Sequence, residues 1–316
     1  MTDSVSAAGG VRLRPALVIL ISLLVYLAGM VLLVQPLIWA AGWAAGLDSA
    51  GMQALMSGDL AVHPQGAMLV RTLQAAYQWL CWGLAGAAAL VLARDGALLR
   101  LPAAHPGLQL GISALLMAAA IPLVGLLTIP EDALRLPAWL AEAERSMRAQ
   151  EAQAQRIQLG LLSEPGMGAL LANLAVFALT PGICEELFFR GMLQRQLGRL
   201  MPPLGAVLIT ALVFSAVHFQ FYGFFARAVL GLLLGLTAWR SGSLLPAMLG
   251  HAVFNGIMVI GVRLALDSGM PAEAVLRDEL PAPLWLSLLA AALTALLTVL
   301  LIRITQPSTS VDSRHA

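Results

Sequence analysis

The sequence has too few charged residues for a water-soluble protein of its length. Charged residues make up 11% of the 316 residues, whereas a soluble globular chain carries about a quarter. Lysine is absent, so all 18 basic residues are arginine, and the formal net charge is +1. This balance excludes a strongly basic nucleic-acid-binding protein and an acidic disordered tail. Because 59% of the residues are hydrophobic and the mean hydropathy is +0.85, most of the surface must face lipid.

Cysteine is almost as scarce as charge. The only two cysteines, Cys81 and Cys184, both lie inside apolar runs, which excludes a disulfide framework and a metal site of the Cys-x-x-Cys type. Cys184 is a conceivable nucleophile, but a thiol in such a run usually packs as a small hydrophobic group, and we favour that interpretation.

Eight apolar stretches meet or approach the length of about 20 residues that a helix needs to cross the hydrocarbon core. The sequence therefore predicts an all-α, polytopic transmembrane helix bundle of about eight spans. No internal repeat stands out, although an inverted-repeat transporter is expected to show one. The predicted spans cover residues 16–44, 67–93, 107–129, 166–193, 204–219, 224–239, 244–266 and 283–304.

The distribution of arginine predicts the orientation of the bundle. With a cytoplasmic N-terminus, the first outer loop at 48–65 has no arginine, as the positive-inside rule favours. We therefore expect a bacterial inner-membrane protein with both termini in the cytoplasm. The arginines of the inner segments are then Arg12, Arg14, Arg94, Arg100, Arg195, Arg199, Arg240, Arg303 and Arg314.

Three regions follow from this layout. Residues 1–165 contain the first spans and a long, mixed-charge outer loop, whose segment 136–162 predicts a helix in the outer interface or a solvated linker helix. Residues 166–266 contain most of the polar residues that lie inside spans and form a predicted helical core. Residues 267–316 contain the last span and a cytoplasmic tail.

Ionisable residues inside spans are costly and usually mark function, and here they concentrate in the second half of the chain. Glu186 and Arg190 are four residues apart, so they share a helix face and predict a buried ion pair. Glu185 is rotated by about 100° from Glu186, which leaves it as a free carboxylate suited to act as a general base. In the first three spans only Arg71 is ionisable and clear of the ends.

Two further spans supply imidazoles and an amide. His218 lies on the fifth predicted span, and His251 and Asn255 share one face of the seventh. Together with Glu185, these groups suffice to activate water and to stabilise an oxyanion. Either histidine alone is equally explained as an interhelical hydrogen bond, and for Asn255 alone that explanation is favoured. Glu185 beside the ion pair, with both histidines downstream, is harder to explain as packing. The Gly231 and Gly235 pair of the sixth span predicts close internal packing and only weakly suggests dimerisation.

At these residues the sequence resembles the CPBP family, the CAAX protease and bacteriocin-processing intramembrane proteases. This family includes the type II CAAX prenyl endopeptidases and the Abi-type proteins. The resemblance covers roughly residues 173–261, where all three family motifs occur in order. They are Glu185-Glu186-x-x-x-Arg190, Phe214-x-x-x-His218 and His251-x-x-x-Asn255.

The resemblance implies a role for each of these residues. Glu185 with His218 would activate the attacking water, and His251 with Asn255 would stabilise the tetrahedral oxyanion. The substrate would be a protein or peptide, as in CAAX-type or bacteriocin- and immunity-related processing. A prenylated C-terminal peptide is the eukaryotic theme of the family. No recognition domain identifies the substrate of this chain.

The Glu186 and Arg190 pair would support the site. The family is often described as metalloproteases, and Glu185, His218 and His251 would suit a three-ligand zinc site. The chain has no His-Glu-x-x-His motif, however, and the residues do not by themselves require a metal. They suit a zinc site and a metal-free glutamate-type site equally, and we favour the second.

Two other functions remain open from the sequence. The buried ionisable groups also suit a proton-coupled transporter, in which Glu185 and the histidines form a relay. A non-catalytic immunity or scaffold protein of the same family is the third hypothesis.

Overall fold

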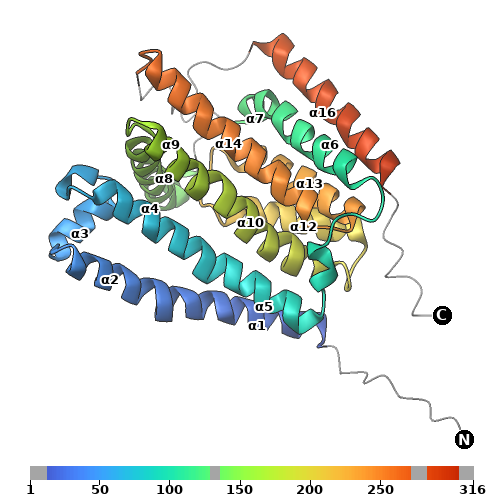
Figure 1. Cartoon of the computed structure of the whole chain (residues 1–316), viewed down its shortest axis with the longest axis horizontal. Coiled ribbons are helices and arrows are strands. Elements are labelled where there is room, and N and C mark those ends of the chain that lie inside the picture. Colours follow the sequence, from blue (N-terminus) through green and yellow to red (C-terminus); the bar gives the residue numbers. More distant parts are fainter. Residues whose placement is uncertain (1–12, 129–135, 272–282, 306–316) are drawn as a thin grey trace, which may run out of the picture.

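The computed structural model describes residues 13–128, 136–271 and 283–305. These residues form helices and connecting turns, with no strand among them, so the predicted all-α fold is confirmed. Figure 1 shows long helices that pack side by side in a bundle. Arg12, Arg314 and the end of the predicted cytoplasmic tail lie outside the described residues.

Among the described residues, seven helices are long and apolar enough to cross a membrane. An eighth apolar helix, α12, is shorter, so the prediction of about eight spans is confirmed. The seven are Pro15–Ala44, Gly66–Ala93, Pro106–Leu127, Met167–Leu197, Phe224–Ser241, Leu245–Asp267 and Leu284–Ile304.

Several of these long helices consist of consecutive α-helical elements. The α-helices are α1 Pro15–Ala28, α2 Gln35–Ala44, α3 Ser49–Met56, α4 Gly66–Tyr77, α5 Leu84–Ala93, α6 Pro106–Ala119, α7 Ile121–Leu127, α8 Ala141–Leu162, α9 Met167–Leu174, α10 Thr180–Glu186, α11 Arg195–Leu197, α12 Pro203–Ala216, α13 Phe224–Ser241, α14 Leu245–Asp267 and α16 Leu284–Ile304. Short 3₁₀ turns cover Leu60–Val62, Gly96–Leu99 and Ala138–Leu140.

π-Helical segments join the α-helical parts of three spans. They are η1 Gly29–Val34, η3 Gln78–Gly83, η6 Ala175–Leu179 and η7 Leu187–Gln194. A π-turn shifts the face that the rest of a helix presents to its neighbours, and such turns are frequent at functional sites. Three of the four lie on the spans Gly66–Ala93 and Met167–Leu197, which the site below joins.

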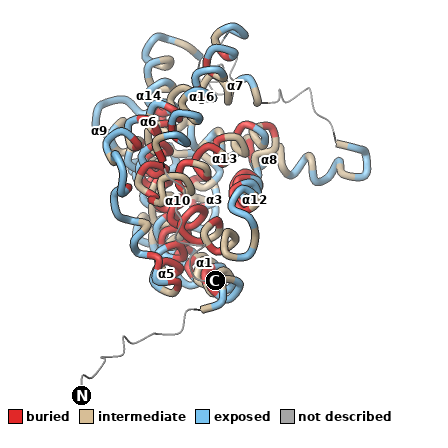
Figure 2. The backbone as a smooth tube through the Cα atoms, turned by 90° about the vertical axis from the view of Figure 1, so that its right-hand side faces the viewer, coloured by how far each residue is buried: buried red, intermediate tan, exposed pale blue. Residues whose placement is uncertain are grey.

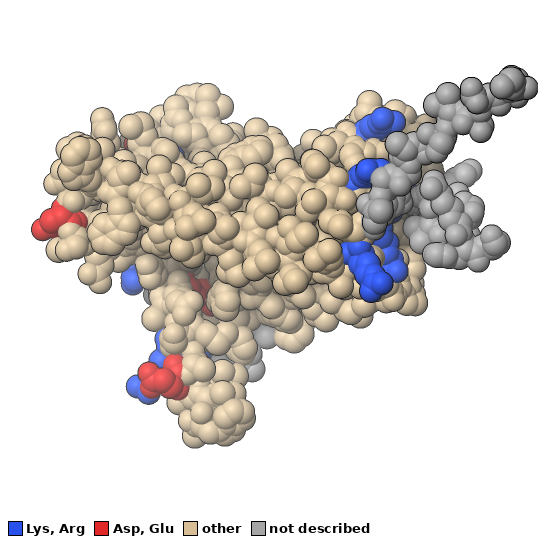
Figure 3. All heavy atoms as spheres, turned by 90° about the horizontal axis from the view of Figure 1, so that it is seen from below, with Lys and Arg blue, Asp and Glu red and all other residues tan. Residues whose placement is uncertain are grey.

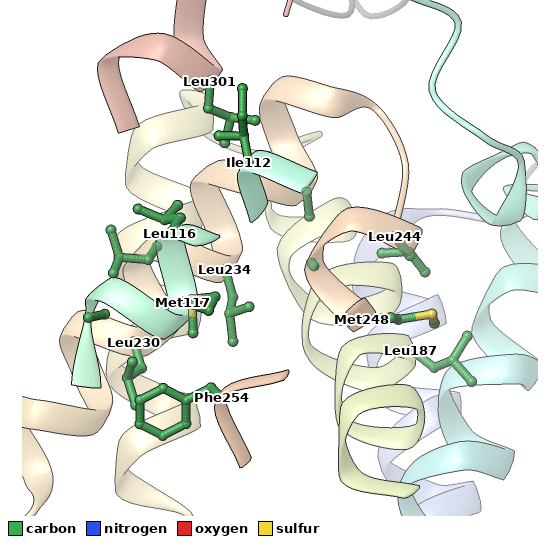
Figure 4. Close-up of a cluster of buried hydrophobic side chains, with 14 of the residues drawn as sticks. Ile112, Leu116, Met117, Leu187, Leu230, Leu234, Leu244, Met248, Phe254 and Leu301 are labelled. Atoms are coloured by element: carbon green, nitrogen blue, oxygen red, sulfur yellow. The ribbon is translucent and has the colours of Figure 1, made fainter. Parts of the chain in front are cut away.

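The buried core lies along the inner helices of the bundle. Figure 2 shows buried residues concentrated on α10 and α13, while the outer faces of the bundle are exposed. Large apolar side chains such as Leu32 and Leu296 are among those exposed, as expected where lipid replaces water. A cluster shown in Figure 4 joins several helices through Ile112, Leu116 and Met117 of α6, Leu187 of η7, Leu230 and Leu234 of α13, Met248 and Phe254 of α14, and Leu301 of α16.

The predicted outer-loop helix is present as α8. Figure 2 shows α8 and the turn before it leading away from the bundle. Two ion pairs of the i,i+3 and i,i+4 type, between Glu142 and Arg145 and between Glu144 and Arg148, lie in its first turns. Its placement in the membrane interface or in solution stays a prediction.

Candidate active site

The predicted ion pair lies at the centre of the bundle. Arg190 Nη1 donates to Glu186 Oε1 at 2.6 Å, and both side chains are fully buried. Arg190 Nη2 donates to the Gly231 carbonyl at 3.0 Å, and the guanidinium carbon lies 4.6 Å from the centre of the Phe214 ring. These partners offset part of the cost of removing two charges from water.

Glu186 also holds His251. The same oxygen, Oε1, lies 2.8 Å from His251 Nδ1. Because Glu186 is paired with Arg190 and acts as an acceptor, the proton of this hydrogen bond is assigned to Nδ1. The ring therefore presents Nε2 on its opposite side.

His218 is fixed in the same tautomer by a different partner. Its Nδ1 lies 2.6 Å from the Phe214 carbonyl, which can only accept, so Nδ1 donates. The 4.9 Å and 6.0 Å distances between ring centroids place the Phe214 ring against both His218 and His251. Phe214 thus contacts both imidazoles and the guanidinium of Arg190, a role that its place in the second motif did not reveal.

Both Nε2 atoms face one oxygen of Glu185. His218 Nε2 and His251 Nε2 each lie 4.0 Å from Glu185 Oε2. This separation is too long for a direct hydrogen bond. A water about 2.8 Å from each of two such atoms would make an angle of about 90° with them at its oxygen, which is compatible with two hydrogen bonds. Glu185 and His251 are buried and the His218 side chain is 29% exposed, so a carboxylate and two imidazoles converge at a spacing that one bridging water can span.

Asn255 lies on the same helix as His251 but has a different partner. Its Nδ2 donates to the Phe177 carbonyl in η6 at 3.0 Å. Within the described part of the chain, the side-chain hydrogen bonds of Asn255 include none to Glu185, His218 or His251. The structure therefore brings together three of the four predicted groups and leaves Asn255 on an interhelical hydrogen bond.

Gly231 and Gly235 pack inside the molecule. A Cβ atom at Gly231 would lie 3.0 Å from the Ala211 Cα atom of α12, so the missing side chain lets α12 and α13 approach closely. The two carbonyls accept from Arg190 and Gln194 at 3.0 Å and 2.9 Å. This arrangement is the close internal packing that the sequence predicts.

Glu185, His218 and His251 are residue types that bind zinc, but their ligand atoms are spaced more widely than in a zinc site. A carboxylate and two imidazoles with exposed Nε2 atoms are a common donor set for zinc. In a tetrahedral site with bonds of about 2.0–2.2 Å, neighbouring ligand atoms lie about 3.4 Å apart. The observed 4.0 Å separations are wider, and the described residues contain no group of His, Cys, Asp and Glu with metal-ligand geometry. A zinc ion would therefore require these side chains to move closer together than they lie here.

One polar residue of the centre comes from outside the three motifs. Gln78 Nε2 donates to Glu185 Oε1 at 3.0 Å, so Glu185, which is outside the Arg190 ion pair as predicted, accepts a hydrogen bond that the sequence did not indicate. Gln78 lies 107 residues before Glu185, on the span Gly66–Ala93. A single amide in an apolar run carries no charge to attract attention, which is why the sequence did not indicate it.

The comparisons with known proteins agree with the three motifs. Residues 167–257 match the family model described as type II CAAX prenyl endopeptidase Rce1-like. No curated protein and no solved structure matches the chain. The matched segment is less than a third of the chain, and it contains Glu185, His218, His251 and Asn255. The segment 167–257 of this membrane protein thus resembles the type II CAAX prenyl endopeptidase (Rce1-like) family, in agreement with its three motifs.

Proposed function

We propose that the protein is an intramembrane endopeptidase in which Glu185 activates a water molecule for attack on a peptide bond. The observation that carries this proposal is the pair of 4.0 Å separations between Glu185 Oε2 and the two imidazole Nε2 atoms. Three groups from separate elements, with their other polar atoms already engaged, converge on one position that suits a water.

In the proposed reaction, water donates one hydrogen bond to Glu185 Oε2 and one to His218 Nε2. Glu185 takes a proton as the water oxygen attacks the carbonyl carbon, and a tetrahedral intermediate with one negative oxygen forms. Glu185 then returns the proton to the leaving amine nitrogen as the carbon–nitrogen bond breaks. No step requires a metal ion.

His251 is the proposed oxyanion donor. It can donate from Nε2 only when both ring nitrogens carry protons, and the Glu186 carboxylate on Nδ1 accommodates that form. Asn255 would join it only if the hydrogen bond to the Phe177 carbonyl were exchanged for one to the substrate. The role of Asn255 therefore depends on a rearrangement, whereas that of His251 does not.

The decisive variant is Glu185→Gln, which keeps the shape of the side chain and removes its basicity. Loss of a general base lowers the rate by about 10²–10⁴-fold. Membranes containing this variant or the parent would be compared by mass spectrometry for peptides that accumulate uncleaved. Glu142→Gln on the exposed start of α8 is the matched control. Unchanged cleavage with Glu185→Gln would refute the proposal, and Glu185-dependent proton flux without cleavage would support the transporter instead.

We further propose a protein or peptide substrate of the CAAX type, cut near the cytoplasmic face of a bacterial inner membrane. The orientation is supported by Figure 3, where arginines gather without visible acidic neighbours at one end of the bundle, whereas arginines at the opposite end lie beside acidic residues. Arg240 at the end of α13 donates to the Ile302 and Thr305 carbonyls at the end of α16, and Arg199 binds Asp95 beyond α5. A phosphatase reporter fused to the C-terminus should stay inactive, because such reporters need export; an active fusion would reverse the orientation.

A further inference from the structure

The centre of the site contains one group from the first half of the chain, outside the segment 167–257. Gln78 is 7% exposed, and its Nε2 is the donor to Glu185 Oε1. Only the NH₂ end of an amide can face a carboxylate, so this contact fixes the orientation of the Gln78 side chain. Its Oε1 is buried and has no partner among the described residues, so no second bond opposes that orientation.

The backbone around Gln78 is held from both sides. Directly before it, the Tyr77 hydroxyl is hydrogen-bonded to that of Tyr26 at 2.7 Å, which ties this turn to α1. Four residues after it, the Trp82 ring packs against the Phe188 ring with 4.8 Å between centroids. Gln78 is therefore presented to Glu185 by a segment that is itself fixed in place.

A glycine further along the span permits this approach. A Cβ atom at Gly86 would lie 2.6 Å and 2.7 Å from backbone atoms of Leu187 and Phe188. No side chain fits at that distance, so the backbones of α5 and η7 are in direct contact. The contact lies just beyond Glu185 along its span and brings the two spans close enough for the Gln78 bond.

The bond to Gln78 fixes the rotation of the Glu185 carboxylate, so that one of its oxygens faces the imidazoles. A carboxylate has two equivalent oxygens and rotates readily about its last bond. With Oε1 tied to Gln78, Oε2 is the oxygen directed at His218 and His251. Without the donor, Oε1 would be a buried acceptor lacking a partner, and the carboxylate would turn to find another.

We infer that Gln78 is a positioning residue, which orients the Glu185 carboxylate for water activation. This inference rests on the proposed function, in which Glu185 is the general base. It assigns part of the catalytic geometry to a helix that the family match does not include.

The experiment compares Gln78→Met and Gln78→Glu with the parent. Met keeps the length of the side chain without a donor, and a misplaced general base is expected to lower kcat by about 10- to 100-fold with KM nearly unchanged. The matched control is Gln109→Met on α6, because Gln109 is equally buried and donates to the Ala104 carbonyl instead. Thermal stability in detergent is measured for each variant.

Gln78→Glu tests the hydrogen bond itself. Two carboxyl groups this close share one proton, and the protonated group then donates to the other. Its activity should approach that of the parent as the pH falls and be lost as the pH rises, while Gln78→Met stays low throughout. The other titratable groups that interact with Glu185 in the described part of the chain are His218 and His251, Arg227 of α13, and Cys184, Glu186 and Arg190 on its own span. All of them are common to these variants.

The outcomes separate the two proposals. If Glu185→Gln retains activity, the proposed function fails and this inference fails with it. If Glu185→Gln is inactive but Gln78→Met behaves like Gln109→Met, only the positioning role is refuted. Should Gln78→Met not fold, Gln78→Glu decides, because a flat pH profile relative to the parent would also refute that role.

Discussion

Two buried polar clusters share the span Gly66–Ala93, and they use their polar atoms differently. In the first, all three nitrogens of Arg71 are engaged. Nε donates to Asn173 Oδ1 at 2.8 Å, Nη2 to the Leu161 carbonyl at 3.0 Å, and Nη1 pairs with Glu164 at 2.5 Å. This cluster ties α4 to the end of α8 and to α9.

In the second cluster, around Glu185, three polar atoms face one another without direct hydrogen bonds between them. Gln78, seven residues after Arg71, donates to Glu185 in this cluster. The two imidazole Nε2 atoms lie 4.0 Å from Glu185 Oε2, too far for a direct hydrogen bond. A cluster whose polar groups pair directly with one another holds helices together, whereas one in which three groups converge at 4.0 Å can bind a reactant between them. Burial of charge therefore locates both clusters. Whether their polar atoms are bonded directly to one another distinguishes the structural cluster from the candidate catalytic one.

The largest expected effect comes from Arg190→Met. This change leaves Glu186 buried with only the His251 donor, and breaking such a pair costs about 3–5 kcal/mol of unfolding free energy. Because Glu186 also orients His251, activity should fall with stability. Thermal unfolding and peptide cleavage are measured together. Arg190→Lys, which keeps the charge, should lose less of both, and equal losses would mean that the charge is not what matters.

Arg71→Met should lose stability alone. The expected cost is about 2–3 kcal/mol, because three hydrogen bonds are lost but Glu164 is half-exposed and regains water. Cleavage per folded molecule should match the parent, since the described contacts of Arg71 stop short of the Glu185 cluster. A selective loss of kcat in Arg71→Met would erase the distinction between the two clusters.

Spacing along single helices predicted much of this site. The i,i+4 relation between Glu186 and Arg190 fixed their pairing, and long apolar runs located the spans. The predicted helix over 204–219 was wrong at its end, because α12 ends at Ala216 and Phe219 adopts φ +53°. His218 therefore lies on a turn, where its Nδ1 reaches a free carbonyl at the helix end.

Contacts between distant segments were beyond reach of the sequence. Nothing in the residues around Gln78 differs from an ordinary apolar span, and its partner is 107 residues away. The π-turns η3 and η7 were not predicted either, because a π-turn changes which residues face a neighbouring helix without leaving a mark in the composition. Side-chain partners across helices are determined by how the helices pack. The periodicity of residues along one helix does not predict that packing.

Gly231→Ala tests how closely α12 and α13 must approach to keep Arg190 in place. The added methyl group would press on the Ala211 backbone, and such overpacking costs about 1–3 kcal/mol. Gly111→Ala on α6 is the control, because nothing lies within 4 Å of its Cβ position and replacing a helical glycine there should be neutral or stabilising. Opposite signs in thermal unfolding are expected, and a stable Gly231→Ala protein would show that α12 can shift freely.

Cys184→Ala should have the smallest effect, although the thiol is the neighbour of Glu185. Cys184 is fully buried and packs with Trp82 and Phe188, with its sulfur directed at the position of Gly83. Removing one sulfur atom from such a cluster costs about 1 kcal/mol, and kcat should stay within about twofold of the parent. A loss of 100-fold or more in a stable variant would make the thiol the nucleophile and Glu185 its base. Glu185 would then deprotonate the thiol and not a water molecule. This variant therefore decides whether the first step is attack by water or attack by Cys184.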